Sequence, residues 1–236
     1  MFNLRGIASL HRIPHYLMDW AVLSRSCRQR VRLIDSYPCL GDATHQTPFD
    51  AHYFYQGAWL SRKLAQRQPA THVDIGSDVQ VIGVISAFID TVFVDYRPLN
   101  SLLTGLECRQ GNLAGLNIGA ETVDSLSCLH VIEHIGLGRY GDPIEPEGPA
   151  KAAAELARVL APGGSLFLSV PVGRDRVCFN AHRVFAPDSV MRMFSSLKLQ
   201  DSAFVDDRGM FHEHAEPDAM AGCEYGCGMF HFVKVH

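Results

Sequence analysis

Polar side chains able to move a proton follow an apolar stretch in the middle of the chain. Val123–Leu129 has the composition of a buried strand, and His130, Glu133 and His134 come directly after it. Such side chains are costly to bury, and packing alone does not explain them. Histidine has a near-neutral pKa suited to taking a proton from a hydroxyl. The pattern therefore predicts acid–base chemistry at the end of this strand.

The same residues match H-x-x-E-H, a signature in which two histidines of one helix bind a zinc ion. That arrangement needs a long helix and a distant third ligand. Here His130 follows a strand, and Gly136 and Gly138 would interrupt a helix that began after it. We therefore favour proton transfer for this segment and keep zinc binding as the alternative.

A second metal interpretation concerns the C-terminal part of the chain. Cys223 and Cys227 have a spacing found among zinc ligands, and His212 or His214 could complete the set. The pattern lacks a second matched pair of ligands, which favours a surface loop. We therefore expect no metal site in this protein.

Carboxylates follow two further apolar stretches. Asp74 ends the first, just before Gly76 and Ser77, and Asp95 ends the second. Glycine permits a tight turn and a close approach of the backbone to a ligand. A carboxylate at a strand end can accept hydrogen bonds from both hydroxyls of a ribose. The alternatives are an ordinary strand-to-helix turn at Gly76 and a turn-capping role for Asp95.

Strands and helices that alternate after residue 50 must position these groups. Strands are expected at His72–Ile75, Thr91–Val94, Glu107–Gln110, Val123–Leu129, Ser165–Val170, Ala203–Val205 and Met229–Val235. Helices are expected at Asp50–Gln66, Val79–Phe88, Gly148–Leu160 (stopped by Pro162-Gly163-Gly164) and Pro187–Phe194. This order predicts the α/β class, with a doubly wound, mostly parallel sheet covered on both faces. Ligands of such sheets bind outside the carboxyl ends of the strands, where all the polar groups fall.

Before this domain, residues 1–49 are predicted to form an N-terminal helical extension, and residues 50–236 one α/β domain. Phe2–Arg32 has a loosely helical pattern, and Asp35–Pro48 contains the residues of a loop. We expect the extension to cap the ligand cleft. A basic cluster near its end is expected on a solvated helix face, with an acidic partner or a lipid phosphate as the alternative: Arg25, Arg28, Arg30 and Arg32.

Read in order, four segments resemble those of class I S-adenosylmethionine-dependent methyltransferases: HVDIGS, VFVDYRP, SLSCLHVIEHIGLGRYGD and ELARVLAPGGSLFLSVPVG. The third of them and the later FNAHRVF carry a more specific resemblance. From about Phe54 onward the chain is similar to a bacterial family of unknown function within that superfamily. The resemblance implies a Rossmann-like fold and S-adenosylmethionine as cofactor. The cofactor-binding residues that it implies are Asp74, Gly76, Ser77, Asp95, Tyr96, Asn112, Leu113, Leu129 and His130.

The resemblance further implies methyl transfer to a hydroxyl of a small molecule or glycan precursor, for which we expect a sugar or lipopolysaccharide precursor. His182 is expected to remove the hydroxyl proton, with His134 and Glu133 as the next candidates. A role in fixing its loop is the alternative for His182. The side chains expected to hold the acceptor are Arg139, Tyr140, Arg174, Asn180 and Arg183.

The chain departs from the glycine-rich turn of that superfamily at two positions. Asp78 and Gln80 stand where further glycines are usual, so side chains would meet a cofactor there. Two alternatives therefore stay open. One is an enzyme of the same fold that acts on another ligand through its histidine, glutamate and arginine side chains. The other is a non-catalytic binding protein, which has no reason to collect so many polar groups at one sheet edge.

Composition excludes several other classes. A net charge of -4 and a pI near 6.3 argue against nucleic-acid binding through phosphates. No run approaches the ~18 apolar residues of a membrane span, and Asp19 interrupts the apolar patch Leu17–Leu23, so we expect no secretory signal. Seven scattered cysteines are typical of reduced thiols. We expect a cytoplasmic enzyme, with a homodimer as one open assembly state.

Overall fold

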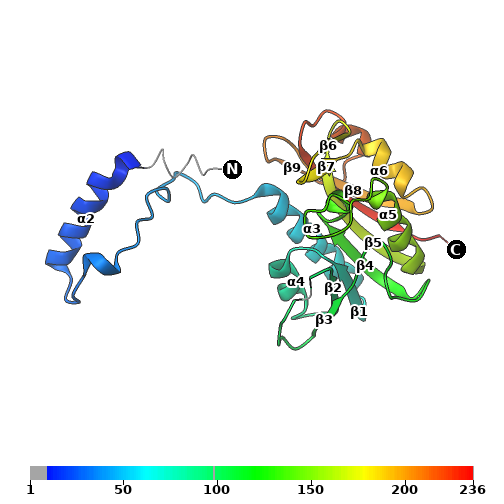
Figure 1. Cartoon of the computed structure of the whole chain (residues 1–236), viewed down its shortest axis with the longest axis horizontal. Coiled ribbons are helices and arrows are strands. Elements are labelled where there is room, and N and C mark those ends of the chain that lie inside the picture. Colours follow the sequence, from blue (N-terminus) through cyan, green and yellow to red (C-terminus); the bar gives the residue numbers. More distant parts are fainter. Residues whose placement is uncertain (1–9, 98, 236) are drawn as a thin grey trace. The chain divides into compact units, whose positions relative to one another are not determined.

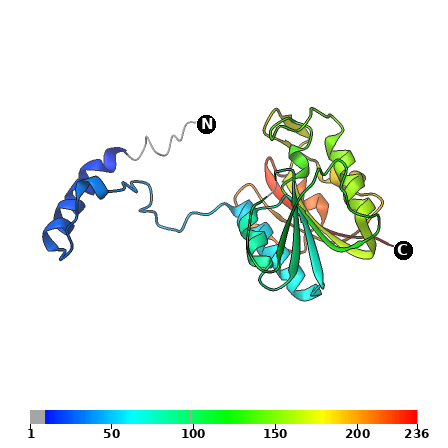
Figure 2. The same cartoon turned by 60° about the horizontal axis from the view of Figure 1, so that its bottom comes forward.

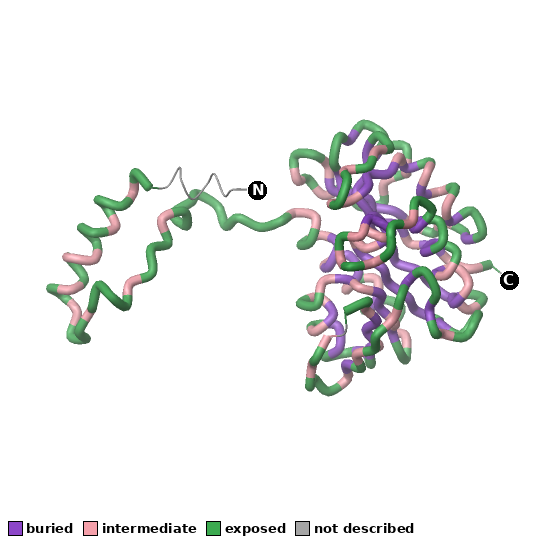
Figure 3. Tube along the Cα trace, in the orientation of Figure 1, coloured by how far each residue is buried: buried purple, intermediate pink, exposed green. Residues whose placement is uncertain are grey.

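The computed structural model describes residues 10–97 and 99–235, and the chain separates into two compact units, Met1–Phe49 and Asp50–His236. In the first unit, the 3-10 turn η1 (Leu10–Arg12) leads into helix α2 (Ile13–Ser26), and a second 3-10 turn, η2 (Leu33–Asp35), follows (Figure 1). None of the residues 10–49 is buried (Figure 3).

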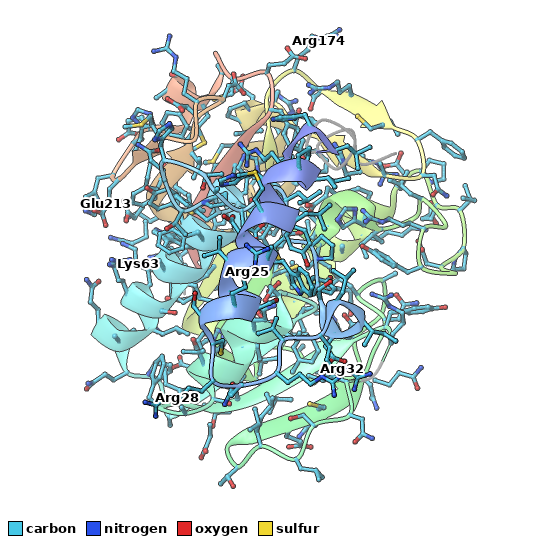
Figure 4. All side chains as sticks on the ribbon, turned by 90° about the vertical axis from the view of Figure 1, so that its left-hand side faces the viewer. Arg25, Arg28, Arg32, Lys63, Arg174 and Glu213 are labelled. Atoms are coloured by element: carbon cyan, nitrogen blue, oxygen red, sulfur yellow. The ribbon has the colours of Figure 1, made fainter. Side chains whose placement is uncertain are left out.

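The predicted helical stretch Phe2–Arg32 is wrong at its C-terminal end, and its residues 2–9 lie outside the described part. The helix stops at Ser26, whose hydroxyl donates to the Val22 carbonyl at 2.9 Å. Serine hydroxyls that bond back to helix carbonyls compete with the helix. Only Arg25 of the basic cluster therefore lies on the helix, and the other three arginines follow it as exposed side chains. Figure 4 labels Arg25, Arg28 and Arg32.

The second unit is built on one eight-stranded sheet with the order β3-β2-β1-β4-β5-β10-β8-β9. The strands are β1 (Thr71–Ile75), β2 (Asp90–Asp95), β3 (Leu106–Gln110), β4 (Val123–Leu129), β5 (Leu160–Val172), β8 (Lys198–Val205), β9 (Phe211–His212) and β10 (Gly226–Val233). The five strands from β3 to β5 are parallel, and β10, β8 and β9 pair antiparallel. The strand order reverses between β1 and β4, which creates a crevice at their carboxyl ends.

Helices cover both faces of this sheet (Figures 1 and 2). On one face, α3 (Ala51–Arg67) and α4 (Val79–Ile85) contribute Trp59 and Ile82 to one buried cluster. On the other, α5 (Gly148–Val159) and α6 (Pro187–Met193) lie beside a second cluster, which includes Leu156 and Phe194. The predicted α/β class with a mostly parallel sheet is therefore confirmed, and the fold is Rossmann-like. No helix of the described residues has the length and apolar character needed to cross a membrane.

Local signals explain most helix ends. Asp50 is the N-cap of α3, as predicted, and accepts a hydrogen bond from the Tyr53 amide at 3.2 Å. Aspartate is among the preferred residues at this position, because its side chain satisfies an amide that the helix leaves free. The helix predicted to reach Phe88 ends at Ile85 instead. The amides of Phe88 and Ile89 both bond to the Ile85 carbonyl, which forms the tight turn into β2.

Two stretches differ from the predicted pattern. The helix before Pro162 does stop, at Val159, but β5 begins at once and carries Pro162–Gly164 inside the strand. The Gly163 amide there bonds to the Lys234 carbonyl at 2.8 Å, so the chain after β10 holds this part of the strand. The stretch after β5 forms a hairpin of two short strands that was not predicted: β6 (Arg176–Cys178) and β7 (His182–Val184).

Candidate functional site

Two cavities of about 300 Å³ each lie at the carboxyl ends of the parallel strands. The first lies over β1, β2 and the segment after β3, and its lining includes Asp95 and Asn112. The second lies against the start of α3 and the 3-10 turn η3 (Ile132–His134), and its lining includes Glu133 and His182. The two cavities adjoin each other, because four residues line both: Gly76, His130, His134 and Tyr140.

Gly76 forms the floor shared by the two cavities. Its φ is +67°, a conformation that glycine adopts without strain. A Cβ atom on it would lie 3.3 Å from Val131 Cγ1 and 3.5 Å from Asp95 Oδ2. A side chain at this position would therefore project between the ends of β2 and β4, which only glycine leaves open to a ligand.

Asp74 lies beneath this turn and lines neither cavity. Its carboxylate accepts hydrogen bonds from the amide and hydroxyl of Ser77 at 3.0 and 2.6 Å, and a further one from Ser127. Burial raises the pKa of Asp74 to about 6, although these hydrogen bonds lower it. Asp74 thus shapes the turn, whereas Ser77 reaches the second cavity and accepts a hydrogen bond from the Leu129 amide at 3.0 Å.

The far wall of the first cavity consists of residues after β2 and β3. The Asp95 carboxylate accepts a hydrogen bond from the Arg97 amide at 2.6 Å, and the intervening residue of the chain, Tyr96, also lines this cavity. Asn112 Oδ1 accepts one from the Ala114 amide at 2.9 Å, which forms a tight turn after β3. The buried Leu113 adds an apolar surface to this wall.

The glycine-rich loop after η3 closes the side of both cavities. Asp142 holds it through hydrogen bonds from the amides of Gly136 at 2.9 Å and Tyr140 at 3.1 Å. The Tyr140 ring lies under the Arg97 guanidinium at 4.4 Å and near that of Arg139 at 5.1 Å. Cation–π contacts of this kind link the loop to the segment after β2, across the first cavity.

His130 stands at the junction of the two cavities in a strained conformation. Its φ is +54°, which is uncommon for a residue of this size. Its Nδ1 lies 2.8 Å from Glu133 Oε1, and its Nε2 lies 3.3 Å from Cys227 Sγ. Burial lowers the pKa of His130, but Cys227 and Glu133 together raise it to about 10.

Two further histidines face the second cavity. His134 Nδ1 lies 2.7 Å from the Ala181 carbonyl oxygen, to which it donates a hydrogen bond. His182 begins β7, and its ring lies 5.2 Å from that of Tyr225. Burial lowers the pKa of both histidines, so both rings are neutral at pH 7.

Three of the five predicted acceptor-binding residues line neither cavity. Arg183 is buried and donates to the backbone carbonyl of Ile135 at 2.7 Å, so it braces η3 from below. Asn180 is exposed in the turn between β6 and β7 with a φ of +58°. Arg174 points into solvent after β5 (Figure 4). Only Arg139 and Tyr140 of the predicted acceptor-binding group line the second cavity.

Several lining residues had no signal in the sequence. Tyr225 comes from the turn before β10 and meets the site only through the fold. The start of α3 was predicted from Asp50, but nothing indicated that this end would face the cavity. Three residues at the start of α3 line the second cavity: Asp50, His52 and Tyr53.

Neither metal set considered from the sequence is assembled among the described residues. His212 pairs with Asp206 at 2.9 Å and His214 with Asp201 at 3.0 Å. Cys223 belongs to the buried apolar cluster beside α5 and α6. His134 turns to the Ala181 carbonyl and not toward His130, because the chain forms a 3-10 turn there instead of a long helix.

A family described as "Caenorhabditis protein of unknown function, DUF268" matches residues 116–211. No curated protein matches the sequence. The bacterial origin expected from the sequence stays a prediction.

Solved structures of similar fold are largely methyltransferases. The N-methyltransferase NodS from Bradyrhizobium japonicum, in complex with S-adenosyl-L-homocysteine, is 12% identical with a TM-score of 0.54, covering 92% of this chain and 98% of that chain. The Burkholderia thailandensis 1,6-didemethyltoxoflavin-N1-methyltransferase is 12% identical with a TM-score of 0.52, covering 81% and 93%. The cyclase SpnF is 14% identical with a TM-score of 0.52, covering 75% and 80%. At these identities the likeness establishes the Rossmann-like fold that these proteins share, and the fold alone.

Proposed function

We propose that residues 50–236 transfer a methyl group from S-adenosylmethionine to a hydroxyl of a small molecule or glycan precursor. One observation carries the proposal. Two connected cavities lie at the strand ends, one lined by Gly76, Asp95 and Asn112, the other by His134 and His182. The side chains of the first cavity can bind a nucleoside, and those of the second can accept a proton.

The first cavity fits the nucleoside half of the cofactor. Gly76 leaves room that a Cβ atom would fill, and Asp95 offers carboxylate oxygens to ribose hydroxyls. Asn112 offers an amide to the adenine amino group, and Leu113 an apolar surface to the ring. When bound, the cofactor supplies a methyl group already activated on its sulfonium centre.

The structure explains why Asp78, one of the two departures from the glycine-rich turn, stands at its position. It caps α4, accepting hydrogen bonds from the amides of Gln80 at 2.8 Å and Val81 at 3.4 Å. The side chain therefore lies along the helix end, although it also lines the second cavity. Gln80 lines neither cavity, so this second departure does not obstruct a ligand.

The protein's own part in methyl transfer is alignment and proton removal. His134 is neutral at pH 7, and its Nδ1 proton bonds to the Ala181 carbonyl, which leaves Nε2 as the proton acceptor. His182 is the second candidate base, neutral and in the same cavity. Glu133 hydrogen-bonds to His130 and orients that ring. Arg139 and Tyr140 are the side chains available to hold an acceptor.

Calorimetric titration of the full chain with S-adenosyl-L-homocysteine tests the proposal. We expect micromolar binding by the wild type and a loss of about 10–100-fold in Asp95→Ala, the value of a charge-assisted hydrogen-bonded pair. Asp188→Ala is the matched control, since Asp188 lines neither cavity. No binding by the folded wild type, or equal binding by Asp95→Ala, would overturn the cofactor assignment.

A second function is favoured by the Asp78 carboxylate at the wall of the second cavity. The chain would then be an enzyme of the same fold that acts on another ligand through its histidine, glutamate and arginine side chains. The fold of SpnF, a protein named as a cyclase, is consistent with this alternative. Wild type that is folded and binds no S-adenosyl-L-homocysteine would favour it.

A further inference from the structure

We propose that His52, His130 and Cys227 together bind one divalent transition-metal ion, with Zn²⁺ as the best match, at the edge of the second cavity. This set differs from both zinc interpretations considered from the sequence. It brings together the first turn of α3, the end of β4 and the start of β10.

The distances suit a single ion. One ligand atom from each of the three side chains lies within 4.8 Å of the other two. The closest pair, His130 Nε2 and Cys227 Sγ, is 3.3 Å apart. Zinc binds imidazole nitrogen at about 2.0–2.1 Å and thiolate sulfur at about 2.3 Å, so a tetrahedral ion needs neighbouring ligand atoms about 3.3–3.7 Å apart. Small side-chain adjustments of His52 complete the set.

The surroundings of His130 provide the outer shell that a metal-bound histidine requires. Glu133 Oε1 lies 2.8 Å from its Nδ1, which leaves Nε2 for the ion. Glu133 is fully buried, and its Oε2 has no hydrogen-bond partner within the described part of the chain. Without an ion, the protonated His130 ring supplies the positive charge beside this carboxylate, and an ion bound at Nε2 would take the place of that proton. The ion's two positive charges would balance the carboxylate and the Cys227 thiolate.

The backbone also indicates a functional constraint at this point. His130 is held at a φ of +54°. Such a conformation is unfavourable for a residue with a Cβ atom and tends to occur at functional sites. It turns the ring toward Cys227 and stacks it at 5.7 Å from the His52 ring. A histidine with ordinary strand geometry would not bring these three ligands together.

The ligand types select the metal. Two imidazoles and one thiolate suit zinc, cobalt and copper, whereas magnesium and calcium prefer oxygen ligands. Three protein ligands leave a fourth tetrahedral position open, as in catalytic zinc sites. His52 and His130 line the second cavity and Cys227 does not, so the open position faces the cavity.

The same atoms could be interpreted as a cysteine nucleophile activated by a histidine and oriented by a glutamate. A nucleophile must reach its substrate, but Cys227 is fully buried and lines neither cavity. A buried sulfur can still bind an ion that enters between the imidazoles. The nearby His52 ring, which a nucleophile would not need, also favours the metal.

An open metal position would act on the proposed reaction. A hydroxyl bound to zinc has a lowered pKa, and it would lie in the cavity that holds His134 and His182. This consequence rests on the proposed methyl transfer, whereas metal binding itself does not.

Titration of chelator-treated full-length protein with Co²⁺, followed by absorbance, tests the proposal. We expect one ion per chain, a thiolate-to-cobalt charge-transfer band, the strong visible bands of four-coordinate cobalt, and displacement by Zn²⁺. Cys227→Ser should lose the charge-transfer band and weaken binding by more than about 100-fold, since even outer-shell partners contribute about 10–100-fold. Glu133→Gln should weaken binding by about 10–100-fold and keep the band. Cys223→Ser, at a buried cysteine outside the set, should bind like the wild type.

Circular dichroism of every variant, and S-adenosyl-L-homocysteine titration of the same samples, separate loss of metal from loss of fold or of cofactor binding. A folded wild type that binds neither Co²⁺ nor Zn²⁺ would overturn the proposal, as would a charge-transfer band that persists in Cys227→Ser. Fast alkylation of Cys227 by iodoacetamide in protein that binds no metal would assign the nucleophile instead.

Discussion

At the scale of single residues, two backbone conformations define the strand ends where the cavities lie. Gly76 and His130 both have positive φ, one without strain and one at a cost. Gly76 thereby keeps space free beside Asp95, and His130 turns its ring toward Cys227. The site depends on both conformations, but only the glycine can be recognised from its residue type.

Replacing Gly76 by alanine should harm both stability and ligand binding. The substitution forces alanine to a φ of +67° and places a methyl group 3.3 Å from Val131. A left-handed conformation costs a residue with a Cβ atom about 1–2 kcal/mol. We expect urea unfolding to show that loss and calorimetry to show weaker S-adenosyl-L-homocysteine binding. Gly115→Ala is the matched control, because nothing lies within 4 Å of its added Cβ atom. Equal behaviour of the two variants would contradict this account.

A buried chain of polar side chains joins β1 to β4 below the cavities. His72 Nδ1 lies 2.9 Å from Ser125 Oγ, and its Nε2 lies 2.8 Å from Ser127 Oγ. Ser127 donates to Asp74, so it accepts from His72 Nε2, and Ser125 donates to Nδ1. His72 is therefore neutral, and burial lowers its pKa to about 3.

This histidine should make stability depend on pH. Between its folded pKa of about 3 and its usual 6.5, the unfolded chain binds a proton that the folded chain does not. Its contribution is fully present above pH 6.5 and is lost as the pH falls. The contribution of Asp74 to stability depends on pH in the opposite direction. Burial raises its pKa from 3.8 to about 6, so its contribution is lost as the pH rises.

Comparing the wild type with His72→Gln isolates the histidine, because Asp74 contributes to both proteins. The difference in free energy of unfolding, wild type minus variant, should rise by about 1.4 kcal/mol per pH unit. The rise should end at pH 6.5, the usual pKa of the histidine, and the difference should then stay level. Urea unfolding at a series of pH values from acidic to neutral measures it. A difference that does not change with pH would show that His72 is not held neutral.

At the scale of elements, the start of α4 explains why Asp78 stands where a glycine-rich turn would have a glycine. Asp78 and Asp50 cap α4 and α3, and both also line the second cavity. We expect Asp78→Ala to lower the free energy of unfolding by about 1 kcal/mol, Asp78→Gly by only a few tenths, and Asp78→Asn by little. Urea unfolding measures this order. An equal loss in alanine and asparagine variants would mean that charge, and not capping, accounts for Asp78.

The elements of the second unit could largely be predicted from the sequence, because β2 and β5 contain the apolar runs Val92–Val94 and Leu166–Leu168 and α3 has a clear N-cap. The hairpin β6–β7 could not, since its strands are short and its turn relies on a positive φ at Asn180. The end of α2 was missed because the serine back-bonding that ends it is a local competition and not a break in periodicity.

The residues of the site also divide into those that could be predicted from the sequence and those that could not. The positions of Asp95 and His134 at the cavities could be predicted, because each lies at or after the end of a parallel strand and the carboxyl ends of such strands meet. His182 instead begins β7, in the unpredicted hairpin after β5. The set of His52, His130 and Cys227 could not be predicted, since its members are far apart in sequence and no local spacing joins them. Only the packing of α3 and β10 against the end of β4 brings them together.

At the scale of the whole molecule, the body 50–236 holds all the buried residues among those described, and residues 10–49 hold none. Both cavities are lined by residues of the body. The capping role expected of the N-terminal extension stays a prediction.

Removing residues 1–49 should therefore leave the fold of the body intact. No described residue of the removed part is buried. Because burial drives folding, we expect a Tm within about 2 °C of the full chain and equally cooperative unfolding. Trypsin should cut the full chain first after the exposed arginines Arg28, Arg30 and Arg32 and release a stable body. Calorimetry and mass spectrometry of the digest measure both. A lower Tm or resistance of these arginines to cleavage would show that the extension packs on the body, and weaker S-adenosyl-L-homocysteine binding by the truncated chain would support the capping role.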